Sequence, residues 1–62
     1  MQFQSYIVMP MRDLGEHCEQ CPPQNADFWG LYGIGEDDHA YAIGDFSTKS
    51  GAEFIKDALE AP

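Results

Sequence analysis

The amino-acid sequence predicts a small α+β protein, in which three antiparallel strands form a sheet and a C-terminal helix packs on one face of it. Three observations lead to this fold class. An aromatic and β-branched segment opens the chain, two similar segments flank a cluster of turn-forming residues, and the C-terminal segment follows a helical apolar period. A chain of 62 residues has room for one domain, so we expect residues 1–62 to form a single folded unit.

The first strand is expected over residues 2–9, which are rich in Phe, Tyr, Ile and Val. Apolar side chains fall on both faces of this strand, which is typical of a strand that is central in its sheet or covered. Proline has no backbone N–H to donate to a ladder, so we expect the strand to end before Pro10.

Residues 11–26 are expected to form an irregular segment with one short helical turn. Asp13 and Glu16 have the spacing of a capping box, in which the first side chain accepts from a helical amide and the second reaches back. Pro22 and Pro23 end any helix at this point. The segment is long for a loop in so small a domain, which makes it either partly helical or a functional appendage.

A β-hairpin is expected over residues 27–46, where two apolar runs flank the turn-forming residues 35–38. A four-residue loop places Tyr32 opposite Tyr41, and a two-residue turn at Asp37 and Asp38 leaves the division of faces unchanged. A three-residue loop would mix the two faces. The expected faces are Phe28, Tyr32, Ile34, Tyr41 and Ile43 on one side, and Trp29, Leu31, Gly33, Ala40, Ala42, Gly44 and Phe46 on the other.

The C-terminal helix is expected over residues 49–60, with Thr48 or Ser50 as its N-cap. Its apolar face carries Ala52, Ile55, Ala58 and Leu59. We expect this face to dock on the hairpin face that holds the small Ala and Gly residues, because small side chains allow close approach. The face with the tyrosines then remains for residues 11–26, for a second subunit or for a partner.

Composition and charge exclude several classes of function. The chain has 11 Asp and Glu residues against 3 Lys and Arg residues, a net charge of -8, so it can neutralise few phosphates and we expect no direct nucleic-acid binding. No apolar run approaches the length of a membrane span, and the first residues do not resemble a secretory signal. We therefore expect no membrane partner and a location in the cytoplasm of the host cell.

Four residues, Cys18, Cys21, His17 and His39, are the soft metal ligands of the chain. Cys21 precedes the hairpin at its open end, whereas His39 lies beside its turn, roughly 23 Å away along an extended strand. We therefore expect no bound metal and no cofactor. Free thiols, a disulfide between the two cysteines and a zinc ion, shared across a dimer or not, remain open alternatives.

Patterns typical of catalysis are weak in this chain. No third residue can be named to orient a Cys–His pair, and carboxylates are too numerous for one acid–base pair to stand out. The glycines of residues 30–35 are followed by three acids, which would repel phosphate. We therefore expect the protein not to be an enzyme.

The cluster of Glu36, Asp37 and Asp38 has two readings: a solvated surface that keeps the domain soluble, or a negative surface that selects a basic partner. Aromatic residues on the adjoining sheet face would add contact area to such an interface. The expected partner-binding residues are Phe28, Tyr32, Ile34, Glu36, Asp37, Asp38 and Tyr41.

Residues 29–59 resemble the hairpin-and-helix pattern of short, mostly uncharacterised phage and prophage proteins. The matching residues are Trp29, Tyr32, Ala42, Ile43, Asp45, Phe46, Thr48, Ala52, Glu53, Phe54 and Ile55. The resemblance implies a mobile-element origin, where tiny acidic proteins inhibit host enzymes, anti-CRISPR proteins among them. It assigns no functional residues.

The expected function is that of a small, non-enzymatic inhibitor or adaptor that docks on a basic, nucleic-acid-handling protein, with an anti-defence role as its sharpest form. Two alternatives remain. One is a small zinc- or thiol-dependent structural module, and the other is a homodimer whose interface is the aromatic sheet face.

Overall fold

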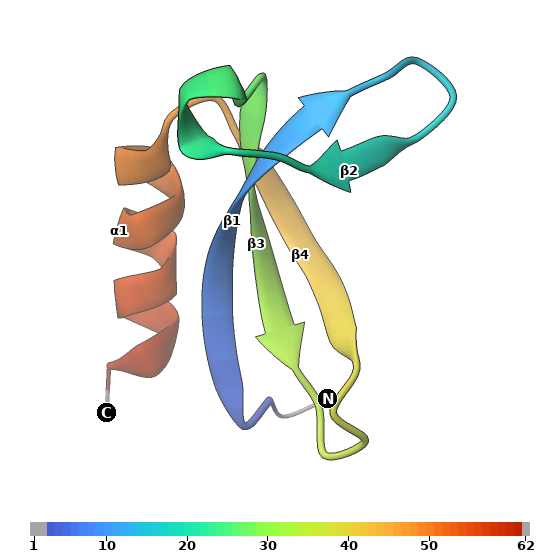
Figure 1. Cartoon of the computed structure of the whole chain (residues 1–62). Helices are drawn as coiled ribbons and strands as arrows, with labels where there is room; N and C mark the ends of the chain where they lie inside the picture. Colours follow the sequence, from blue (N-terminus) through green and yellow to red (C-terminus); the bar gives the residue numbers. More distant parts are fainter. Residues whose placement is uncertain (1–2, 62) are drawn as a thin grey trace.

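The computed structural model describes residues 3–61, and in this range an antiparallel sheet of four strands carries one C-terminal α-helix (Figure 1). The elements are β1 (Ser5–Asp13), β2 (Cys18–Gln20), a 3₁₀ turn η1 (Pro23–Asn25), β3 (Phe28–Ile34), β4 (Ala40–Phe46) and α1 (Lys49–Glu60). The strand order is β2-β1-β3-β4, so β1 is central, as expected. The α+β class, the hairpin and the helix are confirmed, whereas the prediction of three strands missed β2.

Strand β1 does not end at Pro10 but continues to Asp13, and Gln2 of the expected strand lies outside the described residues. Pro10 faces Trp29 of β3 in the ladder, and its C=O accepts a hydrogen bond from Cys21 N at 3.1 Å on the other side. The N–H and C=O of one strand residue point to the same side. An N–H at position 10 would therefore point toward Cys21, which lies beyond the end of β2. Proline at this position consequently removes no hydrogen bond between β1 and β3.

The helical turn expected at residues 13–16 is wrong, because β1 and β2 form a second hairpin in which Asp13 faces Cys18. The short helical turn of residues 11–26 is instead η1, which begins at Pro23, where any helix was expected to end. Asp13 Oδ1 accepts from Gly15 N at 2.8 Å, and Leu14 N donates to His17 O at 3.0 Å. Gly15 has a φ of 91°, a conformation that side chains rarely adopt. Asp13 is therefore a turn residue and not a helix cap.

The loop between β3 and β4 contains three residues, which is the length that mixes the expected faces. Gly35 N donates to His39 O at 3.0 Å, and Asp38 N donates to Gly35 O at 3.0 Å. Asp38 has a φ of 65°, so the loop is a type I turn followed by a left-handed residue. The loop therefore consists of residues 36–38, and the hydrogen-bonded residues Gly35 and His39 flank it.

The three-residue loop and a β-bulge together set which side chains share a face. Tyr41 faces Gly33 and Tyr32 faces Ala42, so the expected pairing of the two tyrosines is wrong. The register shifts between Leu31 and Tyr32, where β4 contains one extra residue. From Gly44 to Phe46, the residues of β4 therefore lie on the faces that the sequence predicted. Ala40 and Ala42 consequently lie on the face of Tyr32, whereas Trp29, Leu31, Gly44 and Phe46 share the opposite face, as expected.

Helix α1 docks on the face that carries Trp29, Leu31 and Phe46. The Nζ atom of Lys49 lies 5.8 Å from the centroid of the Trp29 ring, and the Cα of Gly51 approaches the Phe46 ring so closely that a Cβ there would lie 3.7 Å from it. Leu31 and Ala52 are both 0% exposed, and they form the centre of the core. In Figure 1 the helix is drawn at the left of the sheet, nearest to β1.

The helix begins at Lys49, directly after Thr48, which is one of the two expected N-caps. Thr48 Oγ1 accepts from Gly51 N at 3.0 Å, so Thr48, and not Ser50, is the N-cap. Of the predicted apolar face, Ala52 is buried and Ile55 is half-buried, whereas Ala58 and Leu59 are exposed. Within residues 3–61, no helix combines the length and the apolar character that crossing a membrane requires.

Candidate partner-binding surface

The loop of residues 36–38 presents its three carboxylates to solvent at one end of the sheet. Glu36, Asp37 and Asp38 are all exposed, because a three-residue turn leaves no neighbouring element to cover them. Figure 1 shows this loop at the end of the sheet opposite to the β1–β2 hairpin. None of the three Lys and Arg residues of the chain occurs between residues 13 and 48. Strands β3 and β4 therefore contain no Lys or Arg that could offset the negative charge of the loop.

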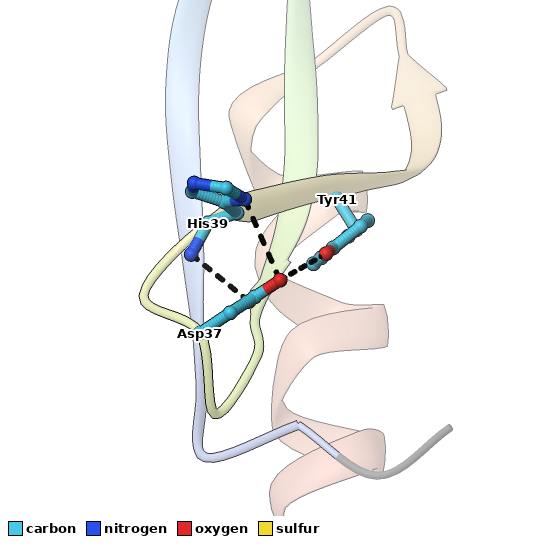
Figure 2. Close-up of polar contacts among 3 residues, drawn as sticks. All are labelled: Asp37, His39 and Tyr41. Carbon is cyan, nitrogen blue, oxygen red and sulfur yellow. Dashed lines mark hydrogen bonds and ion pairs between the residues drawn. The ribbon is translucent and has the colours of Figure 1, made fainter.

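Asp37 is held in place by its neighbours, as Figure 2 shows. Its Oδ1 accepts from His39 N at 3.2 Å, and its Oδ2 accepts from the Tyr41 hydroxyl. The Nδ1 atom of His39 lies 3.4 Å from the same Oδ2, with both side chains substantially exposed. One carboxylate of the loop is therefore engaged within the protein, while Glu36 and Asp38 extend into solvent.

These contacts shift two ionisation equilibria in opposite directions. The hydrogen bonds from the Tyr41 hydroxyl and the His39 amide hold the pKa of Asp37 below its usual value, since both stabilise the carboxylate. The same bond to Asp37 raises the pKa of Tyr41, because it is made by the protonated phenol. Asp37 is therefore ionised at neutral pH, and Tyr41 is neutral.

Tyr41 lies on the helix side of the sheet, apart from Tyr32. Its ring is half-buried, with its centroid 6.1 Å from that of Phe3. Phe3 in turn covers Gly33, where a Cβ would overlap the Phe3 ring. Phe3 therefore lies on the helix side of the sheet, together with Gly33 and Tyr41. The hydroxyl of Tyr41 reaches the loop while its ring supports the sheet.

Tyr32 lies on the opposite face and is also half-buried. Its hydroxyl donates to Met11 Sδ at 3.9 Å, and its ring lies over Gly30. Burial, and after it the charges of Asp45 and Cys18, raises the pKa of Tyr32. Met11 is 6% exposed and faces Phe28 in the ladder, so Tyr32 and Phe28 cover the second small cluster of the core.

The predicted binding residues therefore form two groups and not one. Ile34 adjoins the acidic loop, and Tyr32 is on the same face two residues along β3. Phe28 stands at the other end of β3, about 20 Å from Ile34 at ~3.3 Å per residue. The structure places Ile34 and Tyr41 beside the loop on opposite faces of the sheet, with Tyr32 on the face of Ile34, and it does not bring Phe28 to the loop.

Sequence reasoning missed the contribution of β1 to the open sheet face. Ile7 faces Tyr32 and Ser5 faces Ile34, so this part of β1 extends the face beyond the hairpin. Ile7 is 36% exposed, and the bulge residue Ile43 is 39% exposed. The alternation of β1 contained the signal, but only the pairing of β1 with β3 shows which residues it joins.

The cysteine and histidine residues do not converge. The part of the chain that the structure describes contains no group of three or more His, Cys, Asp or Glu side chains able to hold a metal ion. Cys18 and Cys21 are free and follow an extended path, so their Cα atoms are separated by about 10 Å, beyond the ~7 Å that a disulfide can span. Desolvation and the carboxylates of Asp13 and Asp45 raise the pKa of the Cys18 thiol, which makes it less reactive.

Comparison with known proteins adds no assignment. The chain matches no family model, no curated protein and no solved structure. The site consists of exposed carboxylates at a hydrogen-bonded turn, next to a partly apolar sheet face.

Proposed function

We propose that this chain is a non-enzymatic binding protein whose acidic loop, residues 36–38, and adjoining sheet face dock on a basic surface of a protein partner. The observation that carries the proposal is the charge distribution. Glu36 and Asp38 are exposed at a turn fixed by hydrogen bonds, and no Lys or Arg occurs from residue 13 to residue 48. A negative surface of this kind speeds association with a basic partner and selects against acidic ones.

The proposed role within the cell is to inhibit a nucleic-acid-handling protein or to serve as an adaptor for it. Such proteins present basic surfaces, which a cluster of carboxylates can occupy in place of phosphates. The resemblance of residues 29–59 to phage and prophage proteins supports an anti-defence role, as in anti-CRISPR proteins. The host cytoplasm is the compartment that this role requires.

The charge of the chain favours this proposal over the homodimer. Two copies would bring together surfaces that each belong to a chain of net charge -8, and their repulsion opposes association. A zinc- or thiol-dependent module is less well supported, since the two cysteines are too far apart for a disulfide and meet no further ligands among the described residues.

The proposal is tested by capture from host lysate followed by mass spectrometry. The loop variant is Glu36→Gln with Asp38→Asn, which leaves Asp37 and its hydrogen bonds in place and keeps an amide residue that tolerates the left-handed conformation. The matched control, Glu53→Gln with Asp57→Asn, removes the same charge from α1. We expect the loop variant to lose the partner and the control to retain it. Equal capture by both variants would refute the proposed surface.

A further inference from the structure

Strand β4 is an unpaired edge of the sheet. Within residues 3–61 it pairs with β3 alone, and Figure 1 shows it as the outermost strand on its side. On the opposite side of the sheet, the three residues of β2 pair with residues 11–13 of β1 and leave the earlier part of β1 uncovered by a strand. Of the open edges, β4 is the one that begins directly after the acidic loop.

The ladder pattern identifies the free backbone groups of this edge. Gly35 and His39 are a hydrogen-bonded pair, with Gly35 N donating to His39 O at 3.0 Å. Hydrogen-bonded and non-hydrogen-bonded pairs alternate along antiparallel strands. Tyr41 therefore directs its N–H and C=O toward β3, whereas Ala40 and Ala42 direct theirs to the open edge. Both alanines are exposed, and their small side chains do not screen the backbone.

The first residues of the edge, residues 40–42, lack the protection that natural sheets use against further pairing. Lysine and proline are the usual protective residues, and β4, with the sequence AYAIGDF, contains neither. A bulge is the third common device, but here the extra residue is Ile43, beyond Ala42. The segment from Ala40 to Ala42 therefore remains regular and able to accept a strand.

The charge around this edge selects the occupant. Glu36, Asp37 and Asp38 precede it, Asp45 lies within β4, and no Lys or Arg belongs to β3, β4 or the residues between them. A second copy would bring the same acids to the same edge and be repelled. An extended segment rich in Lys or Arg would instead gain main-chain hydrogen bonds from β4 and charge pairing from the loop.

We propose that β4 binds a basic segment of the partner as an added strand, with Ala40 and Ala42 providing the main-chain hydrogen bonds. This inference rests on the proposed function and specifies the form in which the partner is recognised. The added strand is short, because the bulge at Ile43 interrupts the regular edge, and it ends beside the acidic loop.

The probe is a short synthetic peptide in which Arg and Val alternate, and a peptide in which Glu and Val alternate is the charge control. We expect the Arg peptide to bind and to slow hydrogen exchange at the amides of Ala40 and Ala42, as measured by NMR. Binding that shifts the signals of residues 36–38 without protecting these two amides would refute strand addition and leave the acidic docking surface standing. Protection of the same amides at high protein concentration without peptide would show that the occupant is a second copy.

A variant pair tests the edge directly. Ala42→Pro removes the outward N–H without removing a hydrogen bond to β3, and proline is tolerated on edge strands. Ala42→Thr is the control, which keeps the backbone donor and favours strand. We expect the Pro variant to bind the Arg peptide about tenfold more weakly, or worse, than the Thr variant. Equal affinity, or no binding of the peptide to the wild-type protein, would overturn the inference; the amide protection decides the matter if the Pro variant does not fold.

Discussion

Asp37 connects the loop to strand β4 through both of its carboxylate oxygens. The Tyr41 hydroxyl and the His39 amide donate to it, which lowers its pKa and raises that of Tyr41. Because the pKa of Asp37 is lower in the folded than in the unfolded chain, its contribution to stability is present above the usual Asp pKa and is lost as the pH falls through the lowered value. Tyr41 behaves in the opposite way, since its contribution is lost as the pH rises through the raised value.

Replacing Asp37 by Asn tests this account at the level of a single bond. The Asn side chain still accepts a hydrogen bond from the Tyr41 hydroxyl but carries no charge. It therefore stabilises the protonated form of Tyr41 over the ionised form less than Asp37 does. We expect the pKa of Tyr41 to fall toward the ordinary tyrosine value in Asp37→Asn, as measured by NMR titration of the Tyr41 ring. An unchanged titration midpoint would mean that the Tyr41–Asp37 bond does not persist in solution.

The β3–β4 hairpin depends on a left-handed residue at the end of its turn. Asp38 has a φ of 65°, which aspartate tolerates and β-branched residues resist. We expect Asp38→Val to be about 1–2 kcal/mol less stable than Asp38→Gly, because both variants lose the charge but only valine meets steric strain. Denaturant unfolding measures the difference. Equal stability of the two variants would show that the loop has a different conformation.

A part of this fold can be predicted from sequence when the residues that determine it lie within the segment itself. Helix α1 has the expected bounds because its apolar period and its Thr48 cap are contained within the segment itself. Strand β2 was missed, since all three of its residues are exposed and only pairing with β1 makes them a strand. The acidic loop was predicted at its true place, because turn-forming residues mark it directly.

The register of the hairpin was not predictable to the same degree. Residues 35–38 are compatible with loops of two, three and four residues. The two- and four-residue loops give the same division of faces, whereas the three-residue loop changes it. The three-residue loop turns Tyr41 away from Tyr32, and the bulge at Ile43 then returns Gly44 and Phe46 to the face of Leu31 and Trp29, as expected. The candidate site accordingly retained its carboxylates and lost its predicted tyrosine pair.

The whole molecule carries a net charge of -8, and few of its charges are paired. Among the described residues, the ion pairs are Lys56 with Glu60, at 2.9 Å, and His39 with Asp37, at 3.4 Å. Self-repulsion therefore opposes the compact state, and salt screens it. We expect the melting temperature to rise between low salt and about 0.15 M salt. A flat or falling response would indicate local pairing of the acids or binding of specific cations.

The central claim is that the acidic loop steers the protein to a basic partner. Its most direct test is the association rate constant with the captured partner, measured across a range of ionic strength for the wild-type chain, for Glu36→Gln with Asp38→Asn, and for Glu53→Gln with Asp57→Asn. We expect association of the wild type to slow steeply with salt, the loop variant to associate more slowly at low salt with a flatter dependence, and the helix variant to stay close to the wild type. The same salt dependence for the loop variant and the wild type would contradict the account.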